Sequence, residues 1–376
     1  MATQEMHDNK EYALSVLLSV WPELEDKLEQ LYLINCQHTN GFANKSSAEI
    51  AATIVESGKK YIIFDHCPEA VCIPIIQHID DIYKQCNDPS IQFYYWTGAV
   101  TGQQDYDKLC EVHNLDKNIN ILSSYLFEKA VSNITVYDKP YTPGLREKKF
   151  LCFNRVERLH RVELLNHMLK LDLIKDSFYS FDFTVNSSLD ELEYLNRHEP
   201  GKYDLLLANL DMLPLTINRT PSQTNPVQIW TEDYPYFENS YLSIVTETLF
   251  YKQLSGGRYM HTPSTVRGVF PSEKIYKPIV MRHPFVVVAA PGFLQSLRDR
   301  GYRTFSPMID ETYDTIDDDE ERMLAIVNEI ERLGKWSDVE WQDFTNQVKD
   351  IVEHNAQHIH SLTDFRVTKN IDELFK

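Results

Sequence analysis

Residues 263–305, PSTVRGVFPSEKIYKPIVMRHPFVVVAAPGFLQSLRDRGYRTF, contain a helix start, a buried strand and a second helix in direct succession. Ser272 is a typical helix N-cap, and the apolar residues after it repeat with the spacing of a helix that rests on a core. We expect Pro284 to end this helix. Residues 285–290 form a short, valine-rich apolar run, which is typical of a parallel strand covered on both faces. The stretch therefore predicts a helix–strand–helix unit of a parallel sheet.

The start of the first predicted helix is a candidate ligand site. Parallel sheets bind ligands beyond the carboxyl ends of their strands, where helix N-termini present backbone N–H groups to anions. There, the Glu273 carboxylate can accept hydrogen bonds from ribose hydroxyls, and the Lys274 ammonium can pair with phosphate. The alternative is a capped helix without a ligand, because Ser is a common cap and Glu in a first turn complements the helix dipole.

The rest of the chain repeats the alternation of strands and helices. Before residue 138, the pattern predicts a mostly helical or mixed segment at 11–32, helices at 46–57 and 75–86, and strands at 61–64, 91–96, 120–122 and 135–137. After a turn-rich linker at 138–144, it predicts strands at 149–153, 179–182, 203–207 and 241–247, and helices at 159–171, 317–334 and 336 to about 362. Such alternation is the mark of parallel sheets.

The predicted fold class is α/β, and a length of 376 residues suits two domains. The linker at 138–144 is the best boundary, because it combines prolines, a glycine and polar residues. The expected divisions are a first domain at 1–145, a second at 146–335 and a C-terminal helical extension at 336–376. We expect the helix of this extension to pack across the two domains.

Composition narrows the classes of function. A formal net charge of -19 repels polyanions and disfavours a broad nucleic-acid-binding face, although a local basic patch at 139–161 remains. No apolar run is long enough to cross a bilayer and no secretory signal is evident, so we expect a cytoplasmic protein. The six cysteines are irregularly spaced and indicate reduced thiols. The acidic run at 317–321 is better explained by a helix N-terminus than by a metal, and we expect no metal site.

Three segments together resemble GT-B glycosyltransferases: the strand, Asn-Arg turn and helix at 149–171, YLSIVTET at 241–248, and FPSEKIYKPIVMRHPFVVVAAPGFLQSLRDRGY at 270–302. The run SEKIYKPIVMRHPFVVV is similar to the nucleotide-binding motif of the α1,3-fucosyltransferases. The resemblance covers about 149–334 and implies two Rossmann-like domains that face a cleft. Similar sequences occur in phage genomes, where some glycosyltransferases modify hydroxymethylated bases of viral DNA; a viral protein would act in the host cytoplasm.

The resemblance also implies roles for individual residues. It places Glu273 and Lys274 on the sugar nucleotide and gives Arg155 the part of a diphosphate-binding arginine, whereas Pro278 departs from the family's helix. The predicted donor-binding residues are Arg155, Glu247, Ser272, Glu273, Lys274 and Lys277. A base for the acceptor hydroxyl should come from the first domain. The predicted catalytic residues follow the strand at 61–64 and are Asp65, His66 and Glu69.

The sequence therefore predicts a glycosyltransferase that moves a sugar from a UDP- or GDP-sugar to a hydroxyl acceptor. It is expected to need no metal, and to invert the anomeric centre if the fucosyltransferase likeness holds. The net charge favours a glycan or small-molecule acceptor. Two alternatives stay open, namely a hydroxymethylated base in phage DNA as acceptor, with the patch at 139–161 on the phosphates, and a sugar-nucleotide-binding protein without catalysis.

Overall fold

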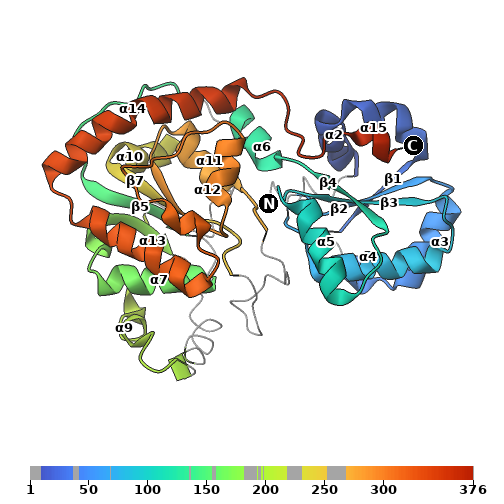
Figure 1. The fold of residues 1–376 in the computed structure, drawn as a ribbon, viewed down its shortest axis with the longest axis horizontal. Helices are drawn as coiled ribbons and strands as arrows, with labels where there is room; N and C mark the ends of the chain where they lie inside the picture. Colours follow the sequence, from blue (N-terminus) through green and yellow to red (C-terminus); the bar gives the residue numbers. More distant parts are fainter. Residues whose placement is uncertain are drawn as a thin grey trace. The chain divides into compact units, whose positions relative to one another are not determined.

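The protein forms two compact units, each built on one parallel sheet (Figure 1). The computed structural model describes residues 10–36, 42–67, 69–134, 137–154, 158–181, 193, 196–197, 199–217, 231–251 and 268–375. The first unit comprises the described residues of Met1–Lys129, Thr262–Phe270 and Thr363–Lys376. The second comprises those of Ala130–His261 and Pro271–Leu362. The chain therefore passes between the units more than once.

The first unit contains four parallel strands in the order β1-β2-β3-β4, with Ile63 of β2 level with Leu33 of β1 and Tyr94 of β3. Its sheet and the elements around it are α2 (Lys10–Val20), η1 (Pro22–Gln30), β1 (Leu31–Asn35), η3 (Phe42–Asn44), α3 (Ser47–Ser57), β2 (Tyr61–Asp65), α4 (Ile73–Cys86), β3 (Gln92–Thr97), α5 (Gly102–His113), β4 (Ile119–Ser123), α6 (Leu126–Ile134) and α15 (Ile371–Leu374).

Both faces of this sheet are buried, because successive side chains of a strand point to opposite faces. Ile62 and Phe64 belong to a core cluster with residues of α3, α4 and α5. Ile63 and Trp96 belong to a second cluster with residues of α2 and with Phe375. In Figure 1, α3, α4 and α5 accordingly lie on one side of the sheet, and α2 and α15 on the other. Continuous apolar strands are the expected result.

The second unit contains four parallel strands in the order β6-β5-β7-β8. Its elements are β5 (Lys148–Asn154), α7 (Leu159–Lys170), η4 (Ile174–Asp176), β6 (Ser177–Phe181), α9 (Asp204–Leu207), η5 (Leu210–Met212), η7 (Thr231–Asp233), α10 (Tyr234–Glu238), β7 (Ser240–Thr246), α11 (Glu273–Val280), β8 (Phe285–Val288), α12 (Phe293–Asp299), η9 (Thr312–Thr315), α13 (Asp319–Gly334) and α14 (Asp338–Ser361). Figure 1 shows α7 and α13 on one side of this sheet and α11 and α14 on the other.

Most predicted elements are confirmed. The prediction of α/β architecture with parallel sheets is correct, and the helix after Ser46 begins with a capping box and ends at Gly58 in the left-handed region. Acids at 317–321 do serve a helix start, because the Asp318 side chain accepts from the backbone N–H groups of Glu320 and Glu321. The cleft and a C-terminal helix that packs across the domains stay predictions. The domain divisions at 145 and 335 also stay predictions, since compactness alone does not define a domain that folds independently.

Some predictions were wrong. Strand β1 was not predicted: the segment at 11–32 is mostly helical as far as Gln30, as expected, but its last two residues begin this strand, whose half-buried pattern makes a weak signal. The residues at 203–207 form a helical turn rather than a strand, since a short apolar run fits either structure. Helix α11 ends at Val280 and not at Pro284, because Arg282 adopts the left-handed conformation. The predicted strand at 135–137 lies mostly outside the described residues. Among the helices that are described, none is long and apolar enough to span a membrane.

Candidate functional site

The second sheet has a topological switch point between β5 and β7. From β5 the chain runs through α7 to β6 on one side, and from β7 it runs through α11 to β8 on the other. In open parallel sheets, the two loops that leave a switch point in opposite directions open a crevice at the carboxyl ends of the strands, and ligands bind there. The described strands of the first sheet follow one another in sequence order, so they contain no switch point. The topology therefore predicts a ligand site at the carboxyl ends of β5 and β7.

Glu247, which directly follows β7, holds the start of α11. Its carboxylate accepts hydrogen bonds from the Ser272 hydroxyl at 2.5 Å and from the Ser272 backbone N–H at 3.3 Å. Both residues are 1% exposed. Because Ser272 is also the N-cap of α11, this clamp fixes the N-terminus of the helix beside the end of β7.

Lys274 extends its ammonium group over this clamp. The Nζ atom donates to the Ser272 hydroxyl and to Glu273 Oε1, each at 2.9 Å, and to the Thr248 hydroxyl at 3.5 Å. A quarter of the Lys274 side chain is exposed, whereas the Glu273 side chain is almost fully buried. The ammonium is therefore held in place before any ligand arrives, on a side chain that is partly open to solvent.

The first turn of α7 brings further polar groups to the same crevice. His160 Nε2 donates to the Glu247 carbonyl at 2.9 Å, and Arg161 Nη2 donates to the Thr246 carbonyl at 3.2 Å. At the strand ends, the Thr246 hydroxyl donates to Asn154 Oδ1, which joins β7 to β5. These contacts tie the α7 N-terminus to the carboxyl end of β7, so both helix starts face one region.

Burial and neighbouring charges shift the pKa values of three titratable groups in the crevice. Burial raises the pKa of Glu247 against the opposing effect of Lys274. Burial also acts to raise the pKa of Glu273, but Lys274 and Lys277 outweigh it, and the pKa of this carboxyl is lowered. Burial, reinforced by the charge of Arg161, holds the pKa of His160 well below its ordinary value. Glu273 is therefore ionised near neutral pH, and His160 is a neutral N–H donor.

Arg161 supplies a cation from inside the protein. Only 3% of the residue is exposed, and burial followed by the charge of Arg158 lowers its pKa to about 9. The guanidinium therefore stays protonated at neutral pH. Opposite charges that act on it come from Glu247 and Glu273. With Arg158 and Lys274, the crevice combines three cations with two carboxylates.

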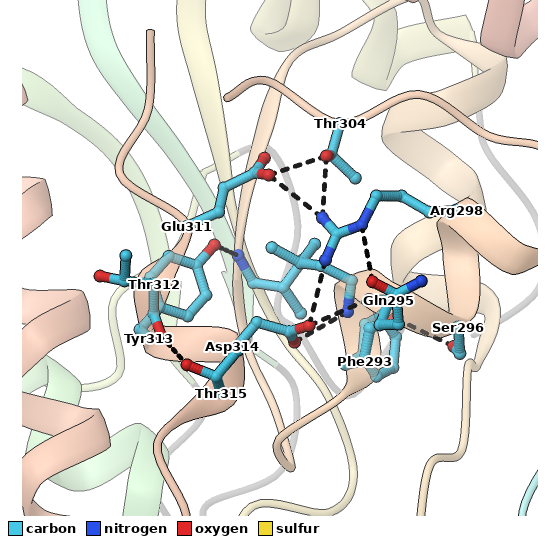
Figure 2. A network of polar contacts seen from close by, with 12 residues as sticks. Phe293, Gln295, Ser296, Arg298, Thr304, Glu311, Thr312, Tyr313, Asp314 and Thr315 are labelled. Carbon is cyan, nitrogen blue, oxygen red and sulfur yellow. Dashed lines mark hydrogen bonds and ion pairs between the residues drawn. The ribbon is translucent and has the colours of Figure 1, made fainter. Parts of the chain in front are cut away.

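The N-terminus of α12, by contrast, already has an anion. Figure 2 shows the Asp314 carboxylate directed at the start of this helix, where it accepts from the backbone N–H groups of Leu294 at 2.8 Å and Gln295 at 2.9 Å. Arg298 lies 3.6 Å from Asp314 and 3.3 Å from Glu311, which completes the network. An incoming phosphate would have to displace a side chain of the same sign, so α7 and α11 offer the better helix starts.

The structure thus brings four of the predicted donor-binding residues together, namely Glu247, Ser272, Glu273 and Lys274. Lys277 is half-buried on α11 and acts on the charge of Glu273. Arg155 lies outside the described residues. In the sequence, Arg158 and Arg161 belong to the predicted basic patch at 139–161, and neither of them was assigned to the donor. The signal that could have found them is a cluster of basic residues around the first turn of a helix that follows a buried strand.

The predicted catalytic residues lie in the first unit, after β2. Asp65 is 2% exposed, and its Oδ1 accepts from the Cys67 backbone N–H at 3.1 Å. His66 is also buried, with Nδ1 at 2.6 Å from the Tyr95 hydroxyl. Glu69 is exposed, and its carbonyl accepts from Gly98 N–H and the Thr97 hydroxyl. Of the three, Glu69 has the side chain that solvent reaches. Catalytic roles for all three stay predictions.

Two buried carboxyls of the first unit predict a pH dependence of stability. Burial raises the pKa of both Asp65 and Asp105 to about 7, from an ordinary value of 3.8. The folded state therefore binds these protons more tightly than the unfolded state does, and stability is lost as pH rises through 7. The free energy of unfolding, measured with urea, should fall between pH 5 and pH 8. In Asp65→Asn and in Asp105→Asn this fall should be smaller than in the wild type by about 1–3 kcal/mol each.

A matched control for this measurement is Asp88→Asn. Hydrogen bonds from Ser90 lower the pKa of the exposed Asp88 carboxyl, so it is ionised in both states across this pH range. Its replacement should leave the slope between pH 5 and pH 8 as in the wild type. Unchanged slopes for the Asp65 and Asp105 variants would contradict the prediction.

The described residues of the predicted basic patch at 139–161 are divided between the two ends of β5. At the amino end of β5, Lys139 pairs with Glu238 at 2.6 Å, and Lys149 pairs with Asp176 at 3.3 Å. Arg158 and Arg161 lie beyond the carboxyl end of β5. This end is about 20 Å from the amino end, because the strand has seven residues. Within the described part of the chain, no group of three or more His, Cys, Asp or Glu side chains could hold a metal ion. The absence of a metal requirement stays a prediction.

Comparison with known proteins finds no matching family model and no matching curated protein. Among solved structures, the chain is similar to a UDP-forming α,α-trehalose-phosphate synthase from Burkholderia xenovorans. The two share 12% sequence identity with a TM-score of 0.41, over 93% of this chain and 75% of that chain. A likeness of this degree does not by itself establish a shared fold or activity.

Proposed function

We propose that this protein is a GT-B glycosyltransferase whose second unit binds a UDP- or GDP-sugar. The observation that carries the proposal is the switch point between β5 and β7, where the starts of α7 and α11 meet three cations and an ionised carboxylate. A nucleotide sugar needs this combination, because its ribose offers hydroxyl donors and its diphosphate is anionic. The resemblance of the motifs at 149–171, 241–248 and 270–302 to GT-B enzymes supports the same assignment.

Each group at the crevice has a role in the proposed reaction. Glu273 accepts from the ribose hydroxyls, and Lys274 with Arg158 pairs with the diphosphate, to which Arg155 and Lys277 are also assigned. The charge of the buried Arg161 guanidinium attracts the diphosphate electrostatically, without direct contact. Glu247 and Ser272 hold the α11 N-terminus, whose backbone N–H groups face the phosphates.

In the proposed chemistry, the acceptor oxygen forms a bond to the anomeric carbon as the bond from that carbon to the diphosphate oxygen breaks. The electron pair leaves with the nucleoside diphosphate, and the fixed cations stabilise its charge without a metal. The acceptor proton passes to a base among Asp65, His66 and Glu69. Exposure favours Glu69, because a base must reach the hydroxyl that it deprotonates. Inversion at the anomeric carbon is part of the proposal.

The proposed acceptor is a glycan or a small molecule. A net charge of -19 repels duplex DNA, and the ion pairs of Lys139 and Lys149 leave fewer free cations for its phosphates. A modified DNA base as acceptor predicts retention on duplex DNA at low salt and a steep loss of binding as salt is added. Absence of retention at low salt would remove that alternative.

The proposal is tested by a thermal-shift panel of UDP- and GDP-sugars, with nucleoside monophosphates for comparison. A ligand that binds only the folded state, and is present at a concentration 100 times its dissociation constant, stabilises that state by about 2.7 kcal/mol. We expect at least one nucleotide sugar to raise the Tm by several degrees, and release of nucleoside diphosphate once an acceptor is present. Stabilisation without release under any acceptor would instead indicate a binding protein. If no nucleotide raises the Tm, the proposed function is wrong.

A further inference from the structure

The second unit contains a cavity at the amino ends of its strands, the end of the sheet opposite the crevice. Its volume is about 380 Å³, and its lining includes Arg146 and Glu238, which lie two residues before β5 and β7, and Met281, Arg282 and His283 ahead of β8. The length of β5 separates it from the switch point by about 20 Å. The cavity is therefore distinct from the proposed donor site. We name it the amino-edge cavity.

Rings and cations dominate the lining of the amino-edge cavity. Tyr137, Tyr141 and Phe237 supply aromatic surface, and Lys139, Arg146 and Arg282 supply three cations. Lys139 pairs with Glu238 of the lining at 2.6 Å, and Arg282 pairs with Glu353 at 2.8 Å. His283 adds no charge at neutral pH, because burial lowers its pKa to about 3. After these two ion pairs, Arg146 gives the recess an excess of one positive charge, on a protein of net charge -19. Its volume falls in the range of about 300–1,000 Å³ that small-molecule sites occupy.

Arg146 is the cation best placed for a ligand. Its guanidinium donates to two backbone carbonyls, that of Glu238 at 2.5 Å and that of Thr142, and lies 5.7 Å from the centre of the Tyr141 ring. These contacts fix the position of the guanidinium with neutral groups, which leave its charge to attract an anion. By contrast, Lys139 pairs with Glu238 at 2.6 Å.

Arg282 supports the opposite wall. It occupies the left-handed conformation (φ 52°) just after α11, a position where glycine is usual and a residue with a side chain is strained. Its guanidinium compensates by donating to Glu353 Oε2 and to the Tyr137 carbonyl, both at 2.8 Å. Arg282 thereby ties the wall formed by Tyr137 to α14.

We propose that the amino-edge cavity is a second ligand site, which binds a small ring compound carrying one anionic group. The anion pairs with Arg146, and the ring packs between the side chains of Tyr137, Tyr141 and Phe237. Carboxylates and phosphate esters share this chemistry, since a guanidinium can donate two parallel hydrogen bonds to either. The site does not depend on the proposed glycosyl transfer, because it uses none of the residues at the switch point.

The experiment is calorimetric titration of the full chain with phenyl phosphate and with benzoate. Inorganic phosphate and phenol are the controls, which separate the contribution of the charge from that of the ring. We expect one of the two ring anions to bind at least ten times more tightly than either control. Equal binding of phenol, or no binding of either ring anion, would overturn the proposal.

Variants locate the binding. Arg146→Met should weaken the ring anion by about 10- to 100-fold, the loss of one charge-assisted contact. Lys139→Met, at an exposed side chain, should fold normally and weaken binding about 3-fold or more, because it leaves the Glu238 carboxylate without that partner and so repels an anion. Lys274→Met should leave this binding unchanged. Undiminished binding of the ring anion to Arg146→Met would refute the assignment. If Arg146→Met does not fold, undiminished binding to Lys139→Met would refute it. Either outcome is independent of the result of the nucleotide thermal-shift panel.

Discussion

Replacing Arg322 by methionine should lower the free energy of unfolding by about 3–5 kcal/mol, the usual cost of breaking a buried ion pair. Arg322 is 1% exposed and stacks on the Phe250 ring at 4.2 Å. Its guanidinium donates to the carbonyls of Phe250 at 2.6 Å and Ala289 at 3.1 Å, and pairs with Asp319 at 2.7 Å. Methionine fills the space but leaves these buried acceptors without that donor. Urea unfolding at pH 7 measures the change.

The control for this variant is Lys335→Met. Lys335 directly follows the same helix, α13, and pairs with Glu331, but its side chain is 73% exposed. An exposed pair contributes little, so this variant should stay within about 0.5 kcal/mol of the wild type. Equal losses in the two variants would mean that burial of Arg322 is not the cause.

Replacing Lys274 by methionine should weaken binding of the nucleotide-sugar donor by about 10- to 100-fold, which corresponds to the loss of a charge-assisted contact of about 1.5–3 kcal/mol. The Lys274 side chain is partly exposed at the α11 start, and its ammonium contacts Glu273 and Ser272. Removing it also raises the pKa of Glu273, which Lys274 holds down, and so weakens the ribose contact. Titration calorimetry with the donor that gives the largest thermal shift measures the effect.

Lys175→Met is the matched control. Lys175 lies in the same unit and pairs with Asp172, and 63% of its side chain is exposed. Donor affinity should be unchanged in this variant, and Lys274→Arg, which keeps the charge, should bind more tightly than Lys274→Met. Wild-type affinity in Lys274→Met would remove Lys274 from the donor site.

The strands at 61–64, 91–96 and 285–290 were predictable because a strand buried on both faces is a continuous apolar run. Strand β1 at Leu31–Asn35 was not, since only alternate residues of this edge strand are buried. The α9 turn was missed because four residues are too few to show a helical period. Local patterns thus suffice where burial is complete and fail where a segment is short or half-exposed.

The candidate site divides in the same way. The N-cap role of Ser272 follows from local sequence, and the structure confirms it. The bond from Ser272 to Glu247 joins residues 25 positions apart and depends on the packing of α11 against β7. The switch point itself depends on strand order, which no local pattern contains. The position of Arg161 also depends on strand order, because its guanidinium reaches the Thr246 carbonyl at the end of β7, the strand next to β5.

The composition of the first unit has a consequence for synthesis of the chain on the ribosome. Its four strands are complete by Ser123, but part of one face of their sheet is covered by Ile371 and Phe375. The Phe375 ring stacks on Tyr94 with 4.2 Å between the ring centres, and its carbonyl accepts from the Tyr61 hydroxyl. These contacts cannot form until residue 375 has been translated. The first unit is therefore completed only after residues 130–362, which include all of the second unit, have been translated.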